Sequence, residues 1–382
     1  MKILMVSIPN HHFFQWVNQL EGVGFEVYWF DSTDGGPKVE RIKWVNQIKG
    51  WKLRWDFPFR NRIKEAFPSL YETMQWYNER SIQDVFEQKL EEIKPDIVHC
   101  FEMKLGGLPI LDSMQKYKEI PFVYSSWGSD IFYHKEIGIP QTKFQSFLRR
   151  INYIITDCKR DYEIAKNNGF VNELLGVYIG NGGLDIDKTK IKAVNDRNTI
   201  LIKGYDDGVG KACEIIEALA LVSFAVLQHY KIIVYSCDQV VADAIANNSF
   251  FTNLDVTIYK RGQFVANADL LGYMGQSAIH IANSLSDGLP TSSVEAMGMG
   301  AFPIQSNPGA VSEEVITHGV NGFLIENPFD TAEIARLIIE GLTRVVLRET
   351  AQRYNVNYVD AHFNRAKLQS KIIALYQNVN LL

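Results

Sequence analysis

The chain has 382 residues, of which 46% are hydrophobic and 22% are charged, and its formal net charge is -5. This length allows two domains with separate cores, and the ordinary balance of residue types excludes a largely disordered chain. The negative charge argues against a general nucleic-acid binder, and no window holds the ~20 apolar residues that a membrane-spanning helix requires. Four cysteines lie singly without metal-ligand spacing, which is typical of free thiols in a reducing cytoplasm.

The first half of the chain alternates apolar strand patterns with helical patterns. The strand patterns are, in chain order, KILMVSI, FEVYWF, DIVHCF, PFVYSS, NYIITD and GVYIGN. Helical periodicity lies between them, for example over residues 13–21 and 81–93. Strands that are apolar throughout and separated by helices indicate a parallel sheet with helices on both faces. The first strand is too short for a secretory signal. His99, inside DIVHCF, is expected to be a core histidine.

Residues 41–64 differ from the rest of the chain in charge. They contain eight basic residues and a single acidic one, Asp56, and interleaved with these are the aromatic residues Trp44, Trp51, Trp55, Phe57 and Phe59. Such a mixture is typical of a segment that lies on an anionic membrane face. The alternative is a solvated helical insert whose tryptophans pack inward.

The second half repeats the alternation, with the strand patterns TILIKG, KIIVYS, VTIYKR, AIHIAN, AFPIQS and GFLIEN and with helical patterns over residues 213–227 and 331–341. The polar stretch 185–198 between the halves is typical of a linker. The sequence therefore predicts an α/β fold of two doubly wound, Rossmann-like domains that face a central cleft.

The segment from AIHIANS to Gly300 combines a strand, a polar turn and the start of a helix. Unpaired backbone N–H groups at a helix start, together with the helix dipole, favour a bound phosphate. Glu295 lies about one turn inside this helix, where its carboxylate can accept the vicinal hydroxyls of a ribose. The pattern predicts a site for a nucleotide diphosphate joined to a group rich in hydroxyls.

Two lysines flank the loop after the strand TILIK. Lys203 ends the strand, and Lys211 follows at the start of the next helix. Cations at these two places can hold a diphosphate from both sides. They would stabilise the charge that builds on the leaving group as a glycosidic bond breaks.

The string Asp287-Gly-Leu-Pro-Thr-Ser-Ser-Val-Glu295, followed by SNPGAVSEE and GVNG, resembles the C-terminal signature of the retaining glycosyltransferases of family 4, the glycosyl transferases group 1. DIVHCF, PFVYSSWGSDI, NYIITDCKRDYEIAKNNG and YIGNGGLD also have counterparts in family order. The resemblance implies the GT-B architecture. Residues 1–190 would then bind the acceptor, residues 191–359 would bind the nucleotide sugar, and residues 360–382 would form a helix that crosses back to the first domain.

The resemblance also implies which residues form the site. The catalytic residues would be Asp287 at the sugar face, Lys211, Trp127 and Asp130. The substrate-binding residues would be Glu295, Lys203, Gly288, Leu289, Pro290, Thr291, Ser292, Ser293, Arg261, Gly262, Asn10 and His11. Three positions depart from the family pattern, which usually has Glu at Asp287, His at Trp127 and Arg at Tyr205. The string DID at residues 185–187 looks like a metal-binding motif of another fold and is discounted, because it follows a Gly-Gly turn in the predicted linker.

Together these features predict a hexosyltransferase-type, retaining glycosyltransferase. It would move a sugar from a nucleotide-diphosphate sugar to a glycan or lipid-linked glycan, as in cell-surface polysaccharide synthesis. No metal ion and no cofactor besides the donor are expected. The expected location is cytoplasmic, with a peripheral contact at the inner membrane face through residues 41–64, and no nucleic-acid partner is expected. The alternatives are a GT-B nucleotide-sugar epimerase and a non-catalytic nucleotide-sugar binding protein.

Overall fold

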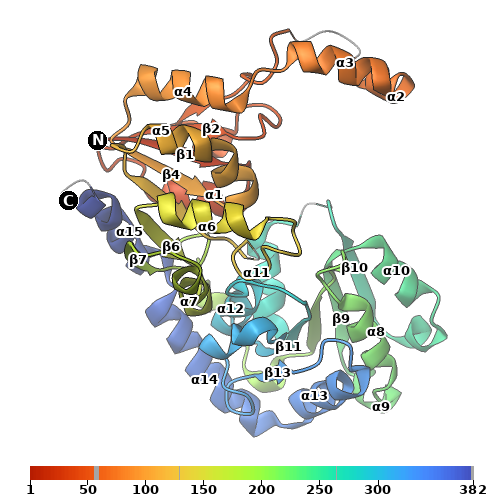
Figure 1. The fold of residues 1–382 in the computed structure, drawn as a ribbon. Coiled ribbons are helices and arrows are strands. Elements are labelled where there is room, and N and C mark those ends of the chain that lie inside the picture. Colours follow the sequence, from red (N-terminus) through yellow and green to blue (C-terminus); the bar gives the residue numbers. More distant parts are fainter. Residues whose placement is uncertain (56–59, 129, 264, 380–382) are drawn as a thin grey trace. The chain divides into compact units, whose positions relative to one another are not determined.

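The computed structural model describes residues 1–55, 60–128, 130–263 and 265–379. The chain forms two compact units (Figure 1). The first comprises Met1–Asp157, Asp161–Gly182 and Gln369–Leu382, and the second comprises Cys158–Arg160 and Gly183–Leu368. Phe57 and Phe59 of the basic aromatic segment lie outside the described residues.

The first unit is built on a seven-stranded parallel sheet of order β3-β2-β1-β4-β5-β6-β7. Its strands are β1 (Lys2–Ser7), β2 (Glu26–Asp31), β3 (Asn46–Ile48), β4 (Ile97–Phe101), β5 (Phe122–Ser125), β6 (Tyr153–Thr156) and β7 (Glu173–Val177). The order changes direction at β1, so the chain winds outward from the centre on both sides, as predicted. The pattern GVYIGN was wrong in position, since β7 ends at Val177 and the residues after it form a loop.

The helices of the first unit are α1 (His11–Asn18), α2 (Arg60–Ala66), α3 (Pro68–Asn78), α4 (Ile82–Ile93), α5 (Leu111–Lys116), α6 (Gln141–Arg150), most of α7 (Lys159–Asn167) and most of α15 (Arg365–Val379). Short turns of 3-10 or π helix lie at Glu40–Ile42, Met103–Gly107 and Leu108–Ile110. Helix α4 shows the local logic: Ser81 caps its start, and the left-handed backbone of Lys94 ends it.

Helix α15 is joined to the sheet of the first unit through a buried polar cluster. The hydroxyl of Tyr376 accepts a hydrogen bond from Trp16 Nε1 and contacts His99 Nδ1, both at 2.8 Å. The other ring nitrogen of His99 lies 2.8 Å from Ser125 Oγ. Burial lowers the pKa of His99 to about 3, so the ring is neutral. The prediction of a core histidine is confirmed.

The second unit has a six-stranded parallel sheet of order β10-β9-β8-β11-β12-β13. The strands are β8 (Thr199–Lys203), β9 (Lys231–Cys237), β10 (Val256–Lys260), β11 (Ser277–Ala282), β12 (Phe302–Ser306) and β13 (Phe323–Ile325). The helices are α8 (Ala212–Ala220), α9 (Phe224–Leu227), α10 (Gln239–Ala246), α11 (Asn267–Gln276), α12 (Thr291–Gly298), α13 (Thr331–Thr343) and α14 (Val345–His362). Turns of 3-10 helix lie at Lys188–Lys190, Val194–Asp196, Ser249–Asn253, Pro308–Ala310 and Ser312–Glu314.

Alternate residues of this second sheet enter two different cores. Ile200 and Ile202 pack with α8 and α13, whereas Leu201 packs with residues of α11 and α12 on the other face (Figure 1). This explains why β8 is apolar from Ile200 to Ile202, before its final lysine. The helical pattern over residues 213–227 is two helices, because Ser223 adopts an extended backbone between them. The doubly wound α/β class predicted from the sequence is confirmed in each unit.

Candidate active site

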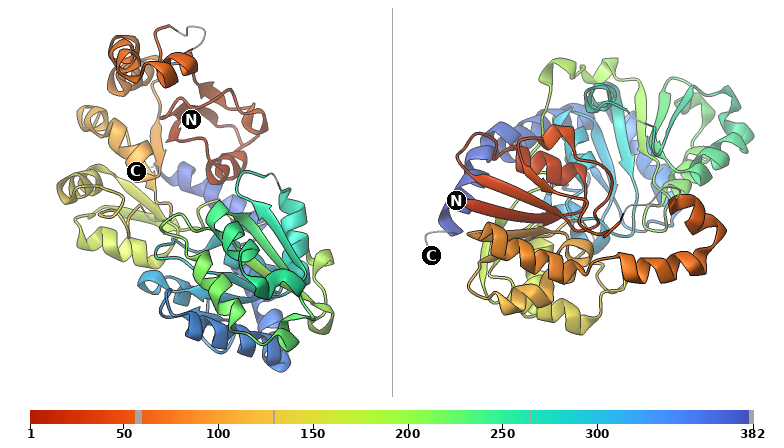
Figure 2. Two further views of the ribbon diagram at one scale, coloured as in Figure 1. Left: turned by 90° about the vertical axis from the view of Figure 1, so that its right-hand side faces the viewer. Right: turned by 90° about the horizontal axis from the view of Figure 1, so that it is seen from above.

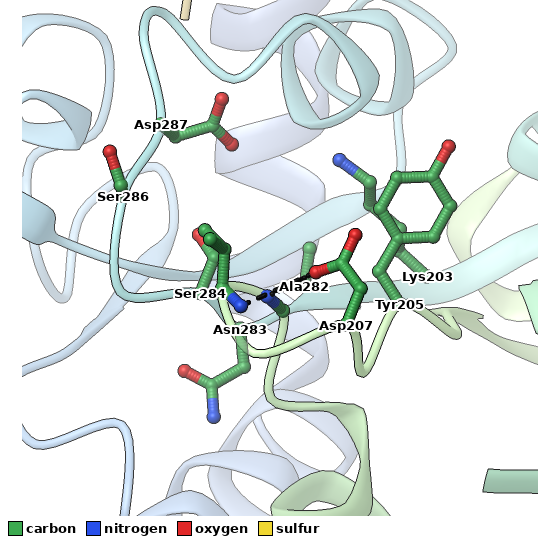
Figure 3. A pocket seen from close by; sticks show the side chains of 10 residues that line it. Lys203, Tyr205, Asp207, Ala282, Asn283, Ser284, Ser286 and Asp287 are labelled. Carbon is green, nitrogen blue, oxygen red and sulfur yellow. Dashed lines mark hydrogen bonds between the residues drawn. The ribbon is translucent and has the colours of Figure 1, made fainter. Parts of the chain in front are cut away.

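The candidate site lies where β8 and β11 end side by side in the second unit. These strands are neighbours in the sheet, and the chain leaves β8 toward β9 on one side and returns to β11 on the other. Parallel sheets bind ligands at such a change of direction, outside the carboxyl ends of the strands. A cavity of about 180 Å³ occurs here (Figure 3). Its lining residues are Lys203, Tyr205, Asp207, Val209, Gly210, Ala282, Asn283, Ser284, Ser286 and Asp287.

The loop after β8 is held tightly against the loop after β11. Asp207 Oδ1 accepts hydrogen bonds from the backbone N–H groups of Val209 and Gly210. Gly210 forms an antiparallel bridge with Ser284. A Cβ on Gly210 would lie 2.4 Å from the carbonyl oxygen of Tyr205, so only glycine fits this turn. The floor of the cavity is therefore set by backbone contacts.

Lys203 and Asp287 face each other over this cavity. Figure 3 shows the ammonium of Lys203 and the carboxylate of Asp287 pointing toward the same hollow. Burial raises the pKa of Asp287, and the positive charges of Lys203 and Arg160 oppose that rise. A cation and a half-buried carboxylate thus stand on opposite sides of a space open to a ligand.

Two cationic side chains lie over the ring of Tyr205. Lys203 Nζ lies 4.8 Å and the guanidinium carbon of Arg261 lies 4.2 Å from the centre of its ring. Arg261 also pairs with Asp207 at 3.0 Å and with Asp238 at 3.1 Å. The family pattern has Arg at position 205. In this chain the positive charge there comes from the two neighbours that stack on the tyrosine.

Glu295 lies on α12 and is half-buried. Burial raises its pKa to about 7, and Asp185 adds to the rise, while Arg365 and Lys203 oppose it. Arg365 itself pairs with Asp185 at 2.9 Å. Glu295 is not among the residues that line the cavity, but its interaction with Lys203 places it near the same edge of the sheet.

The two predicted lysines differ in position. Lys203 lines the cavity, whereas Lys211 does not. The ammonium of Lys211 lies 5.5 Å from the centre of the Phe329 ring, and its backbone N–H donates to Asn283 O at 2.9 Å. Lys203 therefore lies at the cavity, and the predicted diphosphate clamp by both lysines stays a prediction.

The residues of the turn predicted to bind phosphates differ in their exposure to solvent. Thr291 and Ser292 are half-exposed at the start of α12, whereas Gly288, Leu289, Pro290 and Ser293 are buried. The hydroxyl of Ser293 donates to Gln305 Oε1 on β12. The Ser293 hydroxyl is thus used inside the core, and the assignment of Ser293 to substrate binding stays a prediction.

Ser293 belongs to a buried polar network beneath α12. His280 on β11 contacts Ser293 through Nδ1 and the Tyr235 hydroxyl through Nε2 at 3.0 Å. Burial lowers the pKa of His280 to about 3, with Lys203 adding to the effect, so this ring is also neutral. From Gln305 the network continues to Ser306, whose hydroxyl accepts from the backbone N–H of Ser284 in the cavity wall.

This network predicts a stability effect. Ser293→Ala should lower the free energy of unfolding by about 1–2 kcal/mol, because it leaves Gln305 Oε1 buried without that donor. Urea unfolding followed by circular dichroism measures the shift. Thr291→Ala, at the half-exposed start of the same helix, is the matched control. Equal midpoints for the two variants would contradict the role of the network.

The residues predicted from the first domain lie in the first unit. Asp130 is buried and accepts hydrogen bonds from Tyr124 Oη at 2.6 Å and from Met103 N at 2.9 Å, and burial raises its pKa well above the usual range. These contacts hold the loop after β5. Trp127 is half-buried, with its ring centre 5.5 Å from that of Phe101.

Asn10 and His11 lie at the start of α1. Asn10 caps the helix by accepting from His12 N at 2.8 Å, so its side-chain oxygen is already engaged. His11 Nδ1 lies 2.8 Å from Arg41. In the second unit, Gly262 has a φ of +92° and open space around its Cα, which is typical of a turn.

Sequence reasoning missed some residues of the site. Asn283 follows β11 directly and donates to Lys211 O and Pro328 O, so it joins three loops. Arg160, which groups with the second unit, donates to the carbonyl oxygens of Asp287 and Pro308, both at 2.8 Å. Asn283 could have been predicted, because it is a polar residue that directly follows an apolar strand pattern.

Comparisons with known proteins agree with this geometry. Residues 260–357 match the family model of glycosyl transferases group 1, and residues 80–158 match that of glycosyl transferase 4-like proteins. These matches, one in each unit, support a GT-B glycosyltransferase of group 1. This confirms the family 4-like resemblance and the expectation of a hexosyltransferase-type enzyme. A search of curated proteins found no match to the glycosyltransferase.

Solved structures similar to the glycosyltransferase share its fold at low identity. Sucrose-phosphate synthase from Thermosynechococcus elongatus is 14% identical with a TM-score of 0.72, and the match covers 99% of each chain. Anabaena HepE in complex with UDP and glucose is 15% identical with a TM-score of 0.67, covering 99% of this chain and 100% of that one. A UDP-forming trehalose-phosphate synthase from Burkholderia xenovorans is 13% identical with a TM-score of 0.68, covering 99% of each. The predicted GT-B class is confirmed.

Proposed function

We propose that this glycosyltransferase is a retaining enzyme that moves a hexosyl group from a nucleotide-diphosphate sugar to a glycan or lipid-linked glycan. The observation that carries the proposal is the cavity at the ends of β8 and β11, where Lys203 and Asp287 face one hollow beside the start of α12. Solved structures of the same fold hold UDP and UDP-glucose, which supports a donor of this class.

The proposed reaction uses the donor as its own base. The bond between the anomeric carbon and the phosphate oxygen breaks, and its electron pair leaves with the diphosphate. The acceptor oxygen forms its bond on the same face of the sugar, and its proton passes to the departing phosphate. Lys203 and the backbone N–H groups at the start of α12 stabilise the charge on the leaving group. Asp287 accepts a hydrogen bond from a hydroxyl of the transferred sugar.

Proton NMR of UDP-glucose hydrolysis tests this function. The purified enzyme should slowly transfer the glucosyl group to water, and the first product should be the α anomer of glucose. The β anomer as first product would contradict retention. The transferase proposal fails if calorimetry detects binding of nucleotide sugars but neither UDP-glucose nor any other nucleotide sugar is hydrolysed.

We expect the reaction to need no metal ion. The two acids of the DID string are already engaged: Asp185 pairs with Arg365, and Asp187 accepts from the N–H and hydroxyl of Thr189. Turnover should therefore be unchanged by EDTA. A loss of most activity in EDTA, restored by Mg²⁺ or Mn²⁺, would overturn this expectation.

We also propose a cytoplasmic location with a peripheral contact at the inner membrane face, near a lipid-linked acceptor. Among the described residues, no helix combines the length and apolarity that crossing a bilayer requires. The basic and aromatic composition of residues 41–64 supports the contact. Within that segment, Ile42, Val45 and Trp51 are buried against the first unit.

A further inference from the structure

Helices α2 and α3 form a hairpin that leaves the first unit through a narrow neck. At the neck, Arg54 N donates to Asn78 O and Arg80 N donates to Lys52 O, both at 2.8 Å. The buried side chain of Asn78 bonds to both backbone groups of Trp55, at 2.9 Å each. Beyond the neck, the two helices extend away from the sheet (Figures 1 and 2). The base of the hairpin is thus firmly tied, while its helices have wide access to solvent.

The hairpin and its neck expose four large aromatic side chains. Trp76 is 77% exposed, Tyr77 is 63% exposed, and Phe67 and Trp55 are each 62% exposed. Single exposed apolar residues are ordinary, but four aromatic residues within one short segment mark an interaction surface. The sequence assigned the membrane contact to residues 41–64, whereas the exposed rings of the described residues here lie between positions 55 and 77.

Exposed basic side chains lie in the same part of the chain. Arg54, Arg62, Lys64 and Arg80 are exposed, against the exposed acids Glu65 and Glu72. A groove of about 540 Å³ lies at the neck, and its lining residues are Arg54, Trp55, Arg80, Ser81, Asp84, Val85 and Gln88. Two arginines beside a tryptophan provide donors for a phosphate and an amphipathic ring at the level of lipid headgroups.

We propose that the hairpin and its neck, residues 54–55 and 60–80, dock on an anionic lipid surface. This deepens the membrane contact of the proposed function. Trp76, Tyr77 and Phe67 lie at the headgroup level, and the arginines of the neck groove bind lipid phosphates. A second copy of the chain fits less well, because a symmetric interface would set the basic residues of one face against those of the other.

Vesicle flotation tests the proposal, with phosphatidylcholine vesicles and with vesicles that also contain phosphatidylglycerol. The wild type should float with the anionic vesicles. Arg54→Glu with Arg80→Glu should weaken binding at least about 30-fold, because each basic residue removed accounts for roughly fivefold and each added carboxylate is repelled by the anionic surface. Trp76→Ser with Tyr77→Ser should weaken it by about tenfold or more. Tyr354→Ser on α14, 54% exposed, and Arg353→Glu with Lys371→Glu are the matched controls and should bind like the wild type.

The outcomes separate this proposal from the transferase proposal. UDP-glucose hydrolysis without vesicles should be the same in all these variants, which also shows that they fold. No flotation of the wild type, or equal flotation of the hairpin and control variants, would overturn the docking proposal alone. A concentration-dependent dimer that Trp76→Ser with Tyr77→Ser dissociates would assign the face to a second copy and also overturn it.

Discussion

Lys203→Ala should lower kcat for transfer from UDP-glucose by about 10²–10³-fold, with a smaller change in KM. Its ammonium is the cation that lines the cavity, so its charge would oppose the negative charge that develops on the leaving diphosphate. Lys211→Ala should lose less, because that ammonium lies over the Phe329 ring. Initial rates of UDP release measure both effects.

Two further variants sharpen this comparison. Lys203→Arg keeps the charge and should recover part of the lost rate. Lys231→Ala, at the opposite end of the neighbouring strand β9, removes a lysine without touching the cavity and should match the wild type. A larger loss for Lys211→Ala than for Lys203→Ala would show that Lys211 leaves Phe329 to engage the donor, and would reverse our assignment.

The fold was readable from the sequence because its central strands are buried on both faces. Residues such as Ile200, Leu201 and Ile202 are apolar without alternation, and that pattern is typical of a parallel strand covered by helices on both sides. The strand, turn and helix start around Asp287 and Glu295 could also be predicted, because these three elements follow one another directly in the chain.

The directions of individual side chains were not readable. The ammonium of Lys211 lies over the ring of Phe329, more than a hundred positions later. The hydroxyl of Ser293 donates a hydrogen bond to Gln305, on strand β12. Trp51 packs against Phe30 with ring centres 5.0 Å apart, whereas Trp55 is exposed four residues later. Each of these contacts is made with a residue from another element of the fold, so the side-chain direction cannot be predicted from the residues nearby in sequence.

Glu295→Gln should stabilise the free enzyme at high pH and weaken its donor binding. Burial raises the pKa of Glu295 from 4.5 to about 7, so the folded state binds this proton more tightly than the unfolded state does. A raised carboxyl pKa contributes stability that is fully present below the unfolded value and is lost as pH rises through the folded one. Ionised Glu295 therefore costs up to about 3 kcal/mol above pH 7, and the neutral amide avoids this cost.

The same carboxylate is expected to accept hydrogen bonds from the ribose hydroxyls of the donor. The stability lost when Glu295 ionises would therefore be offset by donor binding. Wild-type affinity for UDP should rise as pH increases through about 7, since only the ionised form accepts from both hydroxyls. Glu295→Gln should bind UDP more weakly, with little dependence on pH. Thermal unfolding and calorimetry at about pH 5 and about pH 8 measure both quantities, with Glu349→Gln on the exposed face of α14 as control. If Glu295→Gln melts no higher than the wild type at the upper pH and binds UDP equally well, Glu295 is neither strained nor part of the donor site.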